Sequence, residues 1–266
     1  QILNILENID LSELGHNSEK YVKILISAMD YAYKDRAKYL GDPNFYKVPQ
    51  DLLTSKKYAE KIYQLIQRNK LPSKVDVSIT ESEETTHFSI VDKWGNVVSN
   101  TYTLNTAYGS GIVPTGTGIL MNNEMDDFSS KPGYPNTYGL IGSEANKIEP
   151  KKTPLSSMSP VIVFQENKPY LITGSPGGST IITSVLQEIL NVLDFEMSLE
   201  ESSTKGRIHF QHLPDILFYE QLDNSLIKLL KKDKKLIKRK LGEIHSILLK
   251  KDGIEVFSDK RRPDGK

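Results

Sequence analysis

The 266-residue sequence contains no cysteine, which excludes disulfide bonds, thiolate catalysis and thiolate metal sites. It has no excess charge of either sign, because 34 basic residues balance 34 acidic ones. That balance argues against a general affinity for nucleic acid or for an anionic membrane. No apolar run approaches the roughly 18 residues of a membrane span. With 38% hydrophobic residues, the chain is long enough and apolar enough for a buried core.

The start of the chain also lacks familiar features. It has no initial Met, and "QILNILENID" has neither the charged start nor the long apolar stretch of a signal peptide. We interpret the sequence as part of a larger protein. The missing signal therefore says little about export.

Helical spacing dominates the first part of the chain. Ser18 is a plausible cap for a helix over 19–40, which the sequence Gly41-Asp42-Pro43 would end. A second helix is predicted from Ser55 to Asn69. Residues 70–84 are polar and charged, so we expect an extended linker or a mobile end there.

From Thr85 onward the pattern is that of β-structure. One hairpin is predicted over 87–105 and another over 159–173, each with a polar turn. Residues 129–154 between them form a long loop rich in Gly, Pro, Ser and Asn. Residues 181–193 are apolar on nearly all sides, which predicts a helix buried against a sheet. A further helix near 224–232 and strands near 245–249 and 254–257 complete a layered α and β domain.

Thr85 stands directly after an acidic stretch and directly before a predicted strand. Thr pairs are common at strand starts because of their β-propensity, so a surface turn is one interpretation. The other is that the chain is cut before Thr85. Its free α-amine, with a pKa of about 7.7 to 8, would then serve as the base for its own hydroxyl.

The sequence "GSPGGS" at 174–179 lies between a predicted strand and a predicted helix. Glycines there let backbone amides approach a ligand, so the loop could hold a phosphate or stabilise an oxyanion. It lacks the Lys of a P-loop, and a tight turn is the structural alternative.

Two polar clusters flank the long loop. "LMNNEMDDF" places Glu124, Asp126 and Asp127 where carboxylates could bind an ammonium group or a metal, or simply form a solvated turn. "PLSSMSP" offers the hydroxyl groups of Ser156 and Ser157 as hydrogen-bond donors, although serines before a strand are often turn residues.

Two other patterns favour structural interpretations. His209 and His212 form an i, i+3 pair without an evident third ligand, so no metal site is predicted. The basic run over 228–240 resembles a nucleic-acid patch, but it is interleaved with Leu and Ile. A solvated helix-and-strand face is favoured, and no nucleic-acid partner is expected.

Five motifs occur in one order: "TTHFSIVD", "TYTLNTAYGSGI", "LMNNEMDDFSSKPG", "PLSSMSPVIV" and "TGSPGGS". This order resembles the γ-glutamyltranspeptidase family over essentially the whole chain, with "SDKRRPDGK" similar to the family's C-terminal ending. The resemblance implies an α+β, four-layer αββα fold of the N-terminal nucleophile hydrolases, only partly encoded here. It also implies that residues 1–84 end a large subunit and that 85–266 form the small catalytic subunit.

The resemblance assigns catalytic roles by position. Thr85 matches the nucleophile, which autoproteolysis between Glu84 and Thr85 would release from a zymogen. Thr103 matches the threonine whose hydroxyl supports that nucleophile. Gly177 and Gly178 match the backbone amide pair of the oxyanion hole.

The substrate-binding roles are assigned in the same way. Asn105 and Asp127 match residues that bind the α-amino group of the γ-glutamyl moiety, and Glu124 occupies another contacting position. Ser156 and Ser157 match the hydroxyl groups that bind its α-carboxylate. In a separate position, Tyr138 resembles the tyrosine of a lid loop over the pocket.

The activity that the resemblance implies is γ-glutamyl transfer from glutathione and other γ-glutamyl amides to water or to amino acid and peptide acceptors. It needs no metal or organic cofactor. The expected protein partner is the rest of the large subunit, which forms a heterodimer with the small one and supplies an arginine for the substrate carboxylate. The implied location is periplasmic or secreted.

Two alternatives stay open. One is a cephalosporin or glutaryl acylase of the same fold, whose substrates lack the α-ammonium group. The other is a non-catalytic, incomplete fragment, since we expect residues 1–266 alone to be inactive.

Overall fold

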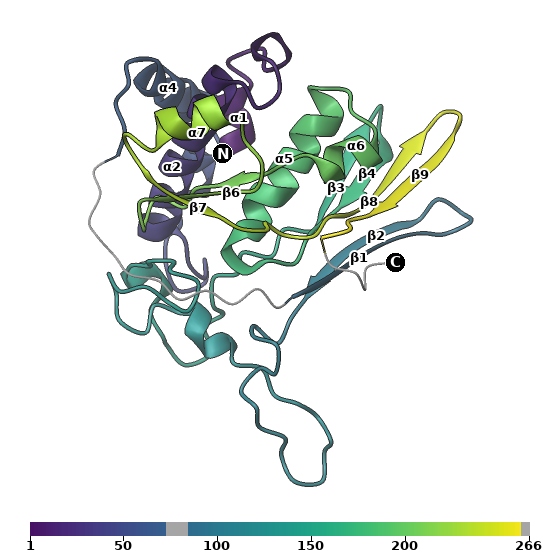
Figure 1. The fold of residues 1–266 in the computed structure, drawn as a ribbon. Coiled ribbons are helices and arrows are strands. Elements are labelled where there is room, and N and C mark those ends of the chain that lie inside the picture. The colour runs from purple at the N-terminus through teal and green to yellow at the C-terminus, as the bar shows by residue number, and fades with distance from the viewer. Residues whose placement is uncertain (73–84, 262–266) are drawn as a thin grey trace.

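The computed structural model describes residues 1–72 and 85–261, and its N-terminal part is helical (Figure 1). Ser18 caps α2 by accepting a hydrogen bond from the Tyr21 amide, and Ser55 caps α4 in the same way. Both helix predictions are confirmed. The short helices α1 and α3 were not predicted. The bounds are α1 (Ile2–Leu6), α2 (Glu19–Tyr39), α3 (Gln50–Leu53) and α4 (Lys56–Gln67).

A hairpin of β1 (Thr86–Val91) and β2 (Val97–Tyr102) confirms the β-structure predicted after Thr85. The carboxylate of Asp92 accepts hydrogen bonds from the amides of Trp94 and Asn96 at 2.8 and 2.9 Å. These bonds fix the turn between the two strands.

The second hairpin is half of a four-stranded antiparallel sheet with the order β3-β4-β8-β9. Glu166 and Asn167 both have positive φ, at 52° and 61°, as in the type I′ turns that suit the twist of a hairpin. The strands predicted near the C-terminus therefore pair with this hairpin in one sheet. The bounds are β3 (Val161–Gln165), β4 (Lys168–Thr173), β8 (His245–Lys250) and β9 (Gly253–Ser258).

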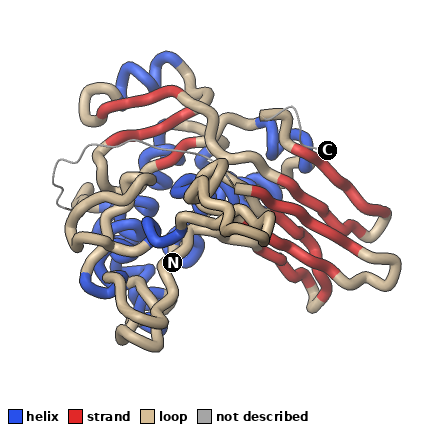
Figure 2. Tube along the Cα trace, turned by 90° about the horizontal axis from the view of Figure 1, so that it is seen from below, coloured by secondary structure: helices blue, strands red, loops and turns tan. Residues whose placement is uncertain are grey.

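Helices and strands are layered around this sheet. α5 (Ile181–Leu193) and α6 (Leu199–Thr204) cover one side, and the β1–β2 hairpin lies along the other (Figure 1). Ile181 and Val185 of α5 pack against Leu171 of β4, so the apolar helix is buried as predicted. Seen from below, the strands of both sheets run together on one side of the molecule (Figure 2). The β, β, α order accounts for three layers of the predicted αββα fold.

A third sheet has the order β5-β6-β7, and its strands were not predicted. β6 and β7 pair in parallel, and α7 connects them. α7 buries Leu226 and Leu230, whereas Lys228 and Lys235 are exposed, so the basic run is a solvated helix-and-strand face. The bounds are β5 (Ile208–His209), β6 (Ile216–Tyr219), α7 (Asn224–Leu230) and β7 (Lys235–Lys238).

The N-terminal helices share one hydrophobic core with the later elements. Leu25 and Met29 of α2 and Ile62 of α4 pack in the same cluster as Leu190 of α5 and Phe210. The predicted linker falls mostly on residues 73–84, which lie outside the described residues. Both that linker and the subunit division before Thr85 stay predictions.

The last described residues are held by buried charges. Arg207 is 2% exposed. Its guanidinium donates to the Asp259 carboxylate at 2.9 Å and to the backbone oxygens of Leu241 and Ser203. The hydrogen bonds satisfy this buried cation, as its desolvation requires.

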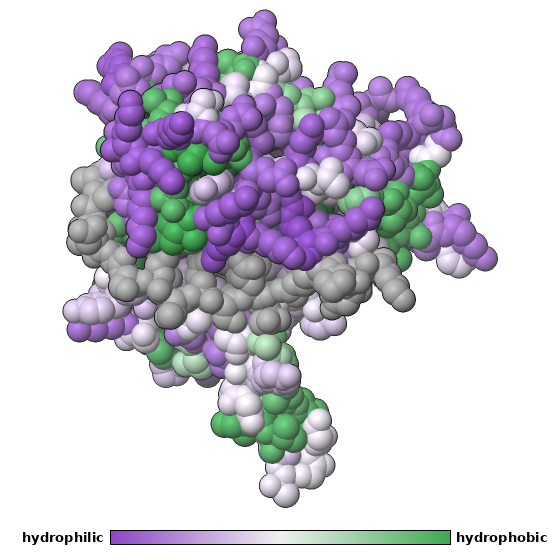
Figure 3. Space-filling model, viewed as in Figure 1, coloured by the Kyte–Doolittle hydropathy of each residue, from purple (hydrophilic) through white to green (hydrophobic). Residues whose placement is uncertain are grey.

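A loop after β2 projects from the body of the molecule (Figure 1). Figure 3 shows hydrophobic surface on this projection. No helix within residues 1–72 and 85–261 is long and apolar enough to cross a membrane. The large apolar side chains exposed on the loop are Tyr108, Ile112, Val113, Ile119 and Met121.

Candidate active site

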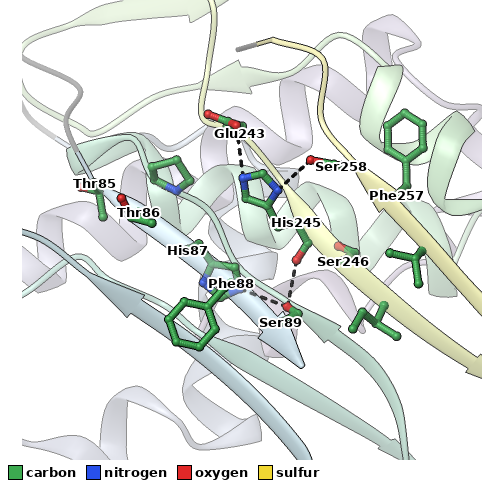
Figure 4. Close-up of a pocket in the computed structure, with 13 residues that line it drawn as sticks. Thr85, Thr86, His87, Phe88, Ser89, Glu243, His245, Ser246, Phe257 and Ser258 are labelled. Carbon is green, nitrogen blue, oxygen red and sulfur yellow. Dashed lines mark hydrogen bonds and ion pairs between the residues drawn. The ribbon is translucent and has the colours of Figure 1, made fainter. Parts of the chain in front are cut away.

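Thr85 directly precedes β1 and lines a cavity of about 320 Å³ (Figure 4). The opposite wall comes from β8 and β9, and Pro176 of the glycine-rich loop forms part of the lining. Thr85 itself is half-buried. The predicted nucleophile therefore borders a space large enough for a reacting group. The predicted cleavage partner Glu84 lies outside the described residues.

His87 supports the floor of this region. Its Nδ1 lies 2.7 Å from the Thr101 hydroxyl, and its ring occupies the space that a Cβ on Gly174 would need. Burial lowers the pKa of His87 to about 4, with a smaller contribution from the charge of His245. The ring is therefore neutral at pH 7. Sequence reasoning assigned His87 no role.

The far wall carries a second histidine. The Glu243 carboxylate lies 3.2 Å from His245 Nε2, and the Ser258 hydroxyl lies 3.1 Å from its Nδ1 (Figure 4). The Glu243 amide donates to the Ser175 hydroxyl at 2.9 Å. This hydrogen bond connects the wall of the cavity to the glycine-rich loop. Neither Glu243 nor His245 was predicted from the sequence to lie at the site.

Gly177 and Gly178 are buried in the turn between β4 and α5, where the sequence placed a strand-to-helix loop. Their φ angles are 131° and 55°, which L side chains rarely adopt. A Cβ on Gly178 would lie 2.5 Å from Cε1 of Tyr138. Both the backbone and the packing therefore require glycine at position 178.

Tyr138 connects the long loop to the segment after β2. It is 5% exposed, and its hydroxyl donates to the backbone oxygen of Asn105 at 2.6 Å and to Asn105 Oδ1 at 2.7 Å. The Asn105 amide donates to the Thr103 hydroxyl at 2.8 Å. The structure thus brings Thr103, Asn105, Tyr138 and Gly178 into one group, while the lid and oxyanion roles stay predictions.

The acidic cluster forms a short 3-10 helix, η2 (Glu124–Asp127). Burial raises the pKa of Asp127 to about 7; the nearby charge of Glu124 raises it further, whereas Arg36 opposes the shift. Burial also raises the pKa of Glu124. Asp126 has a different role, because its carboxylate accepts the Thr137 amide at 2.8 Å. Asp127 is therefore the half-buried carboxylate suited to an ammonium ligand.

The two predicted carboxylate-binding serines differ in their surroundings. Ser156 is exposed, and its hydroxyl accepts the Met158 amide at 3.1 Å, as in a turn. Ser157 is half-buried, and its hydroxyl accepts a hydrogen bond from Nη2 of Arg36 at 2.9 Å. The structure therefore places a buried cation behind Ser157 and close enough to Asp127 to affect its pKa.

Arg36 was not identified from the sequence, although a signal for it exists. It continues the helical face of Val22, Leu25 and Met29, all of which are fully buried. A charged residue at such a position of the helix is buried together with the apolar residues of that face. Burial lowers the pKa of Arg36, and the attraction of Tyr33 and Asp127 opposes that shift.

The predicted residues fall into two neighbourhoods. Of the described residues, the lining of the cavity includes Thr85 but none of the predicted substrate ligands. The ligand cluster formed by Asp127, Ser157 and Arg36 lies apart from that lining. The loop at 174–178 connects the cavity to the group around Tyr138, because Pro176 lines the cavity and Gly178 contacts Tyr138.

The paired histidines have separate partners. His209 Nδ1 lies 2.8 Å from the Thr183 hydroxyl, and His212 Nδ1 lies 2.7 Å from the Asp30 carboxylate. Among residues 1–72 and 85–261, no group of three His, Asp or Glu side chains is arranged to hold a metal. The i, i+3 spacing is explained by buried hydrogen bonds.

Comparison with known sequences places this geometry in context. The profile of the family described as Gamma-glutamyltranspeptidase matches residues 1–266. A glutathione hydrolase proenzyme of Escherichia coli (strain K12) is 48% identical over 274 residues. The alignment covers 99% of this chain and 47% of that protein, so the chain spans about half the length of the curated relatives it matches.

Solved structures that resemble this chain include a member of the same family. Gamma-glutamyltranspeptidase from Pseudomonas nitroreducens, complexed with L-DON, superimposes with a TM-score of 0.64 at 47% identity. That match covers 66% of this chain and 95% of the other. A cephalosporin acylase from Bacillus halodurans matches all of this chain and 47% of its own, with a TM-score of 0.79. At 21% identity, the acylase shows a shared fold alone.

The layered fold, with a strand opening directly after Thr85, is that of the N-terminal nucleophile hydrolases. Within that class, the chain belongs to the gamma-glutamyltranspeptidase family. The family resemblance and the fold class inferred from the sequence are confirmed.

Proposed function

We propose that the protein containing this chain transfers γ-glutamyl groups from glutathione and related amides to water or to amino acid and peptide acceptors. The observation that carries the proposal is the cluster of Asp127, Ser157 and Arg36. In this cluster the buried cation of Arg36 donates to the Ser157 hydroxyl, and its charge also acts on the half-buried Asp127 carboxylate. A γ-glutamyl group needs both, because its outer end carries an ammonium and a carboxylate.

Each end of the γ-glutamyl moiety has a matching set of groups. Asp127 supplies the charge for the ammonium, with Asn105 and Glu124 as further contacts. Ser156 and Ser157 donate hydroxyl hydrogen bonds to the carboxylate. Hydrogen bonds with a charged partner contribute about 1.5–3 kcal/mol each, so this recognition distinguishes a γ-glutamyl group from a simple acyl group.

The reaction proceeds at the other end of the substrate. The Thr85 hydroxyl attacks the γ-carbonyl carbon while its own α-amine takes the proton, with Thr103 supporting the hydroxyl. The amides of Gly177 and Gly178 stabilise the oxyanion. Collapse of the tetrahedral intermediate expels the leaving amine of the substrate, which takes the proton held by the α-amine of Thr85. A γ-glutamyl ester remains on Thr85. Water or an acceptor amine then releases the product and regenerates Thr85.

Maturation and assembly belong to the same proposal. Cleavage between Glu84 and Thr85 frees the α-amine that the mechanism requires. The rest of the large subunit completes a heterodimer. The exposed apolar side chains of the projecting loop support that step, because apolar surface of this kind marks contact sites between proteins. We propose a periplasmic or secreted location by analogy with the family.

The principal alternative is an acylase that accepts glutaryl substrates. A glutaryl group has the carboxylate but no ammonium, so Asp127 would have no partner and would repel the ligand when ionised. The pairing of Asp127 with a cation-held serine favours the γ-glutamyl substrate.

The test uses the full-length protein. N-terminal sequencing after purification is expected to show a chain that begins at Thr85. Hydrolysis of γ-glutamyl p-nitroanilide is expected to exceed that of glutaryl p-nitroanilide. An uncut chain that cleaves neither anilide would refute the proposal, and a preference for the glutaryl compound would support the acylase.

A further inference from the structure

If Arg36 had a purely structural role, its position would leave its hydrogen-bond donors poorly satisfied. Its side chain reaches from α2 to Ser157, is 9% exposed, and donates to the Ser157 hydroxyl at 2.9 Å. Its Nε is buried and has no hydrogen-bond partner among the described residues. A buried guanidinium with an unpaired donor destabilises the fold unless another interaction offsets the penalty.

Arg207 provides a comparison within the same molecule. That guanidinium is also buried, yet it donates to the Asp259 carboxylate and to two backbone oxygens, at 2.9 to 3.1 Å. Its position is explained by cross-linking of the C-terminal segment. The hydrogen bond described for Arg36 goes instead to a hydroxyl in the candidate ligand cluster.

The direction of this hydrogen bond matters for the chemistry of Ser157. A serine hydroxyl has one proton and can also accept. Because its oxygen accepts from Arg36, the proton is directed elsewhere. Accepting from a cation also polarises the hydroxyl and makes it a stronger donor, since linked hydrogen bonds reinforce one another. Ser157 is thereby prepared to donate to an anion.

The positive charge of Arg36 also acts on Asp127, the carboxylate proposed to bind the ammonium group of the same substrate. It attracts Asp127 and so favours the ionised form of that carboxylate. A bound substrate carboxylate would give the buried cation a second negative neighbour. The ligand cluster thus contains fixed charges that match both charges of an α-amino acid group.

We propose that Arg36 is a positioning residue for the α-carboxylate of the γ-glutamyl group, which it serves by holding Ser157 as a hydrogen-bond donor. This inference rests on the proposed function. It assigns a role at the small-subunit pocket to a residue of the large-subunit segment. Arg36 acts through Ser157, so its loss weakens the recognition of carboxylate rather than the reaction at Thr85.

The test compares three anilides with the full-length, processed protein. The γ-glutamyl group has both charges, the glutaryl group has the carboxylate alone, and the 4-aminobutyryl group has the ammonium alone. Measurements at about pH 8.5 keep Asp127 ionised, because that pH lies above its pKa. The variants are R36M, R36K, S157A and the double variant R36M/S157A. K38M is the control, as Lys38 is exposed two residues further along α2.

For R36M we expect KM to rise about tenfold on the γ-glutamyl and glutaryl anilides, the loss typical of a hydrogen bond to a charged group. The 4-aminobutyryl anilide and K38M should change less than about twofold. In the S157A background, R36M should cost little more, because the two residues act as one unit. R36K keeps a charged donor and should recover part of the loss. Where turnover of the 4-aminobutyryl anilide is too slow, its Ki as a competitive inhibitor replaces KM.

Equal losses on all three anilides would show a structural role and overturn the inference. Additive effects of R36M and S157A would also overturn it. If R36M does not fold, an R36K protein whose loss is confined to the two anilides that carry a carboxylate supports the inference, and one with equal losses on all three substrates, or with no loss, overturns it. A wild-type protein that cleaves no γ-glutamyl anilide would remove the proposed function, and the inference with it.

Discussion

The one proton of the Tyr138 hydroxyl is shared between two acceptors of Asn105, its backbone oxygen at 2.6 Å and its Oδ1 at 2.7 Å. This relationship fixes the long loop against the segment that follows β2, and it places the tyrosine ring on Gly178. Asn105 Oδ1 retains a second lone pair, so it can accept from a substrate ammonium at the same time. The proposed lid, ammonium site and oxyanion loop are therefore in direct contact through Tyr138.

Replacing Tyr138 by Phe keeps the ring and removes both hydrogen bonds. We expect KM for γ-glutamyl p-nitroanilide to rise about threefold to tenfold, which corresponds to one or two hydrogen bonds, while kcat changes little. Steady-state kinetics of the processed protein measures this. Y134F is the matched control, because Tyr134 is 56% exposed in the same loop. A drop in kcat with unchanged KM would contradict the lid role.

Gly178→Ala tests the contact between the oxyanion loop and the lid. The new methyl group meets the Tyr138 ring and also occupies a residue with φ of 55°, so we expect a loss of kcat of about tenfold or more. G111A has the same kind of backbone strain, with φ of 70°, but its Cβ meets no atom within 4 Å. If both variants lose activity equally, steric contact with Tyr138 is not the cause. Partial recovery in G178A/Y138A would identify the clash.

Thr85→Ala removes the hydroxyl that serves both cleavage and turnover. We expect the variant to remain one uncut chain with no measurable anilide hydrolysis, as seen by intact mass and by a chromogenic assay. T86A is the matched control, since Thr86 is an exposed strand neighbour, and it should be cut normally. Normal processing of T85A would show that another group is the nucleophile.

The raised pKa of Asp127 predicts how the binding of a substrate ammonium group depends on pH. With its pKa raised to about 7, the carboxylate is neutral below that pH and ionised above it. Binding of a substrate ammonium therefore weakens as the pH falls through 7. The Thr85 amine titrates nearby, but it acts on every substrate, so the ratio of kcat/KM for γ-glutamyl and glutaryl anilides isolates Asp127.

We expect this ratio to fall towards tenfold per pH unit below about pH 7. In D127N the ratio should be flat with pH and lower at pH 8 by about tenfold to a hundredfold, the loss of one charged hydrogen bond. A D127N protein that loses equal activity on both anilides would refute the ammonium-binding role.

Local patterns were enough to predict much of the fold. Ser18 and Ser55 identified the two long N-terminal helices because a capping hydroxyl and helical spacing are short-range features. The first two hairpins and α5 followed from alternation and turn residues. The strands β5, β6 and β7 were not predicted. They are short, and the pairing of β6 with β7 depends on a crossover rather than on a turn.

The residues at the candidate site also fall into those that the sequence indicated and those that it did not. The order of five motifs identified the family. The roles of Thr85, the serines, the acids and the glycines follow from that resemblance and stay predictions. Arg36 and His87 were not predicted to lie beside the candidate site, because their contacts there depend on burial. The helical pattern places Arg36 on a buried face, but not beside Ser157, which comes from a distant part of the chain.

The sequence by itself determined the family, and through it the residues that we propose as nucleophile and as contacts for each end of a substrate, because these assignments depend on residue type and order. Only the tertiary structure decided how the groups act on one another. Packing removes water from Asp127 and raises its pKa, brings Arg36 behind Ser157, and sets Tyr138 against both Asn105 and Gly178. Desolvation and hydrogen-bond geometry arise from contacts between distant segments, so a linear pattern does not contain them.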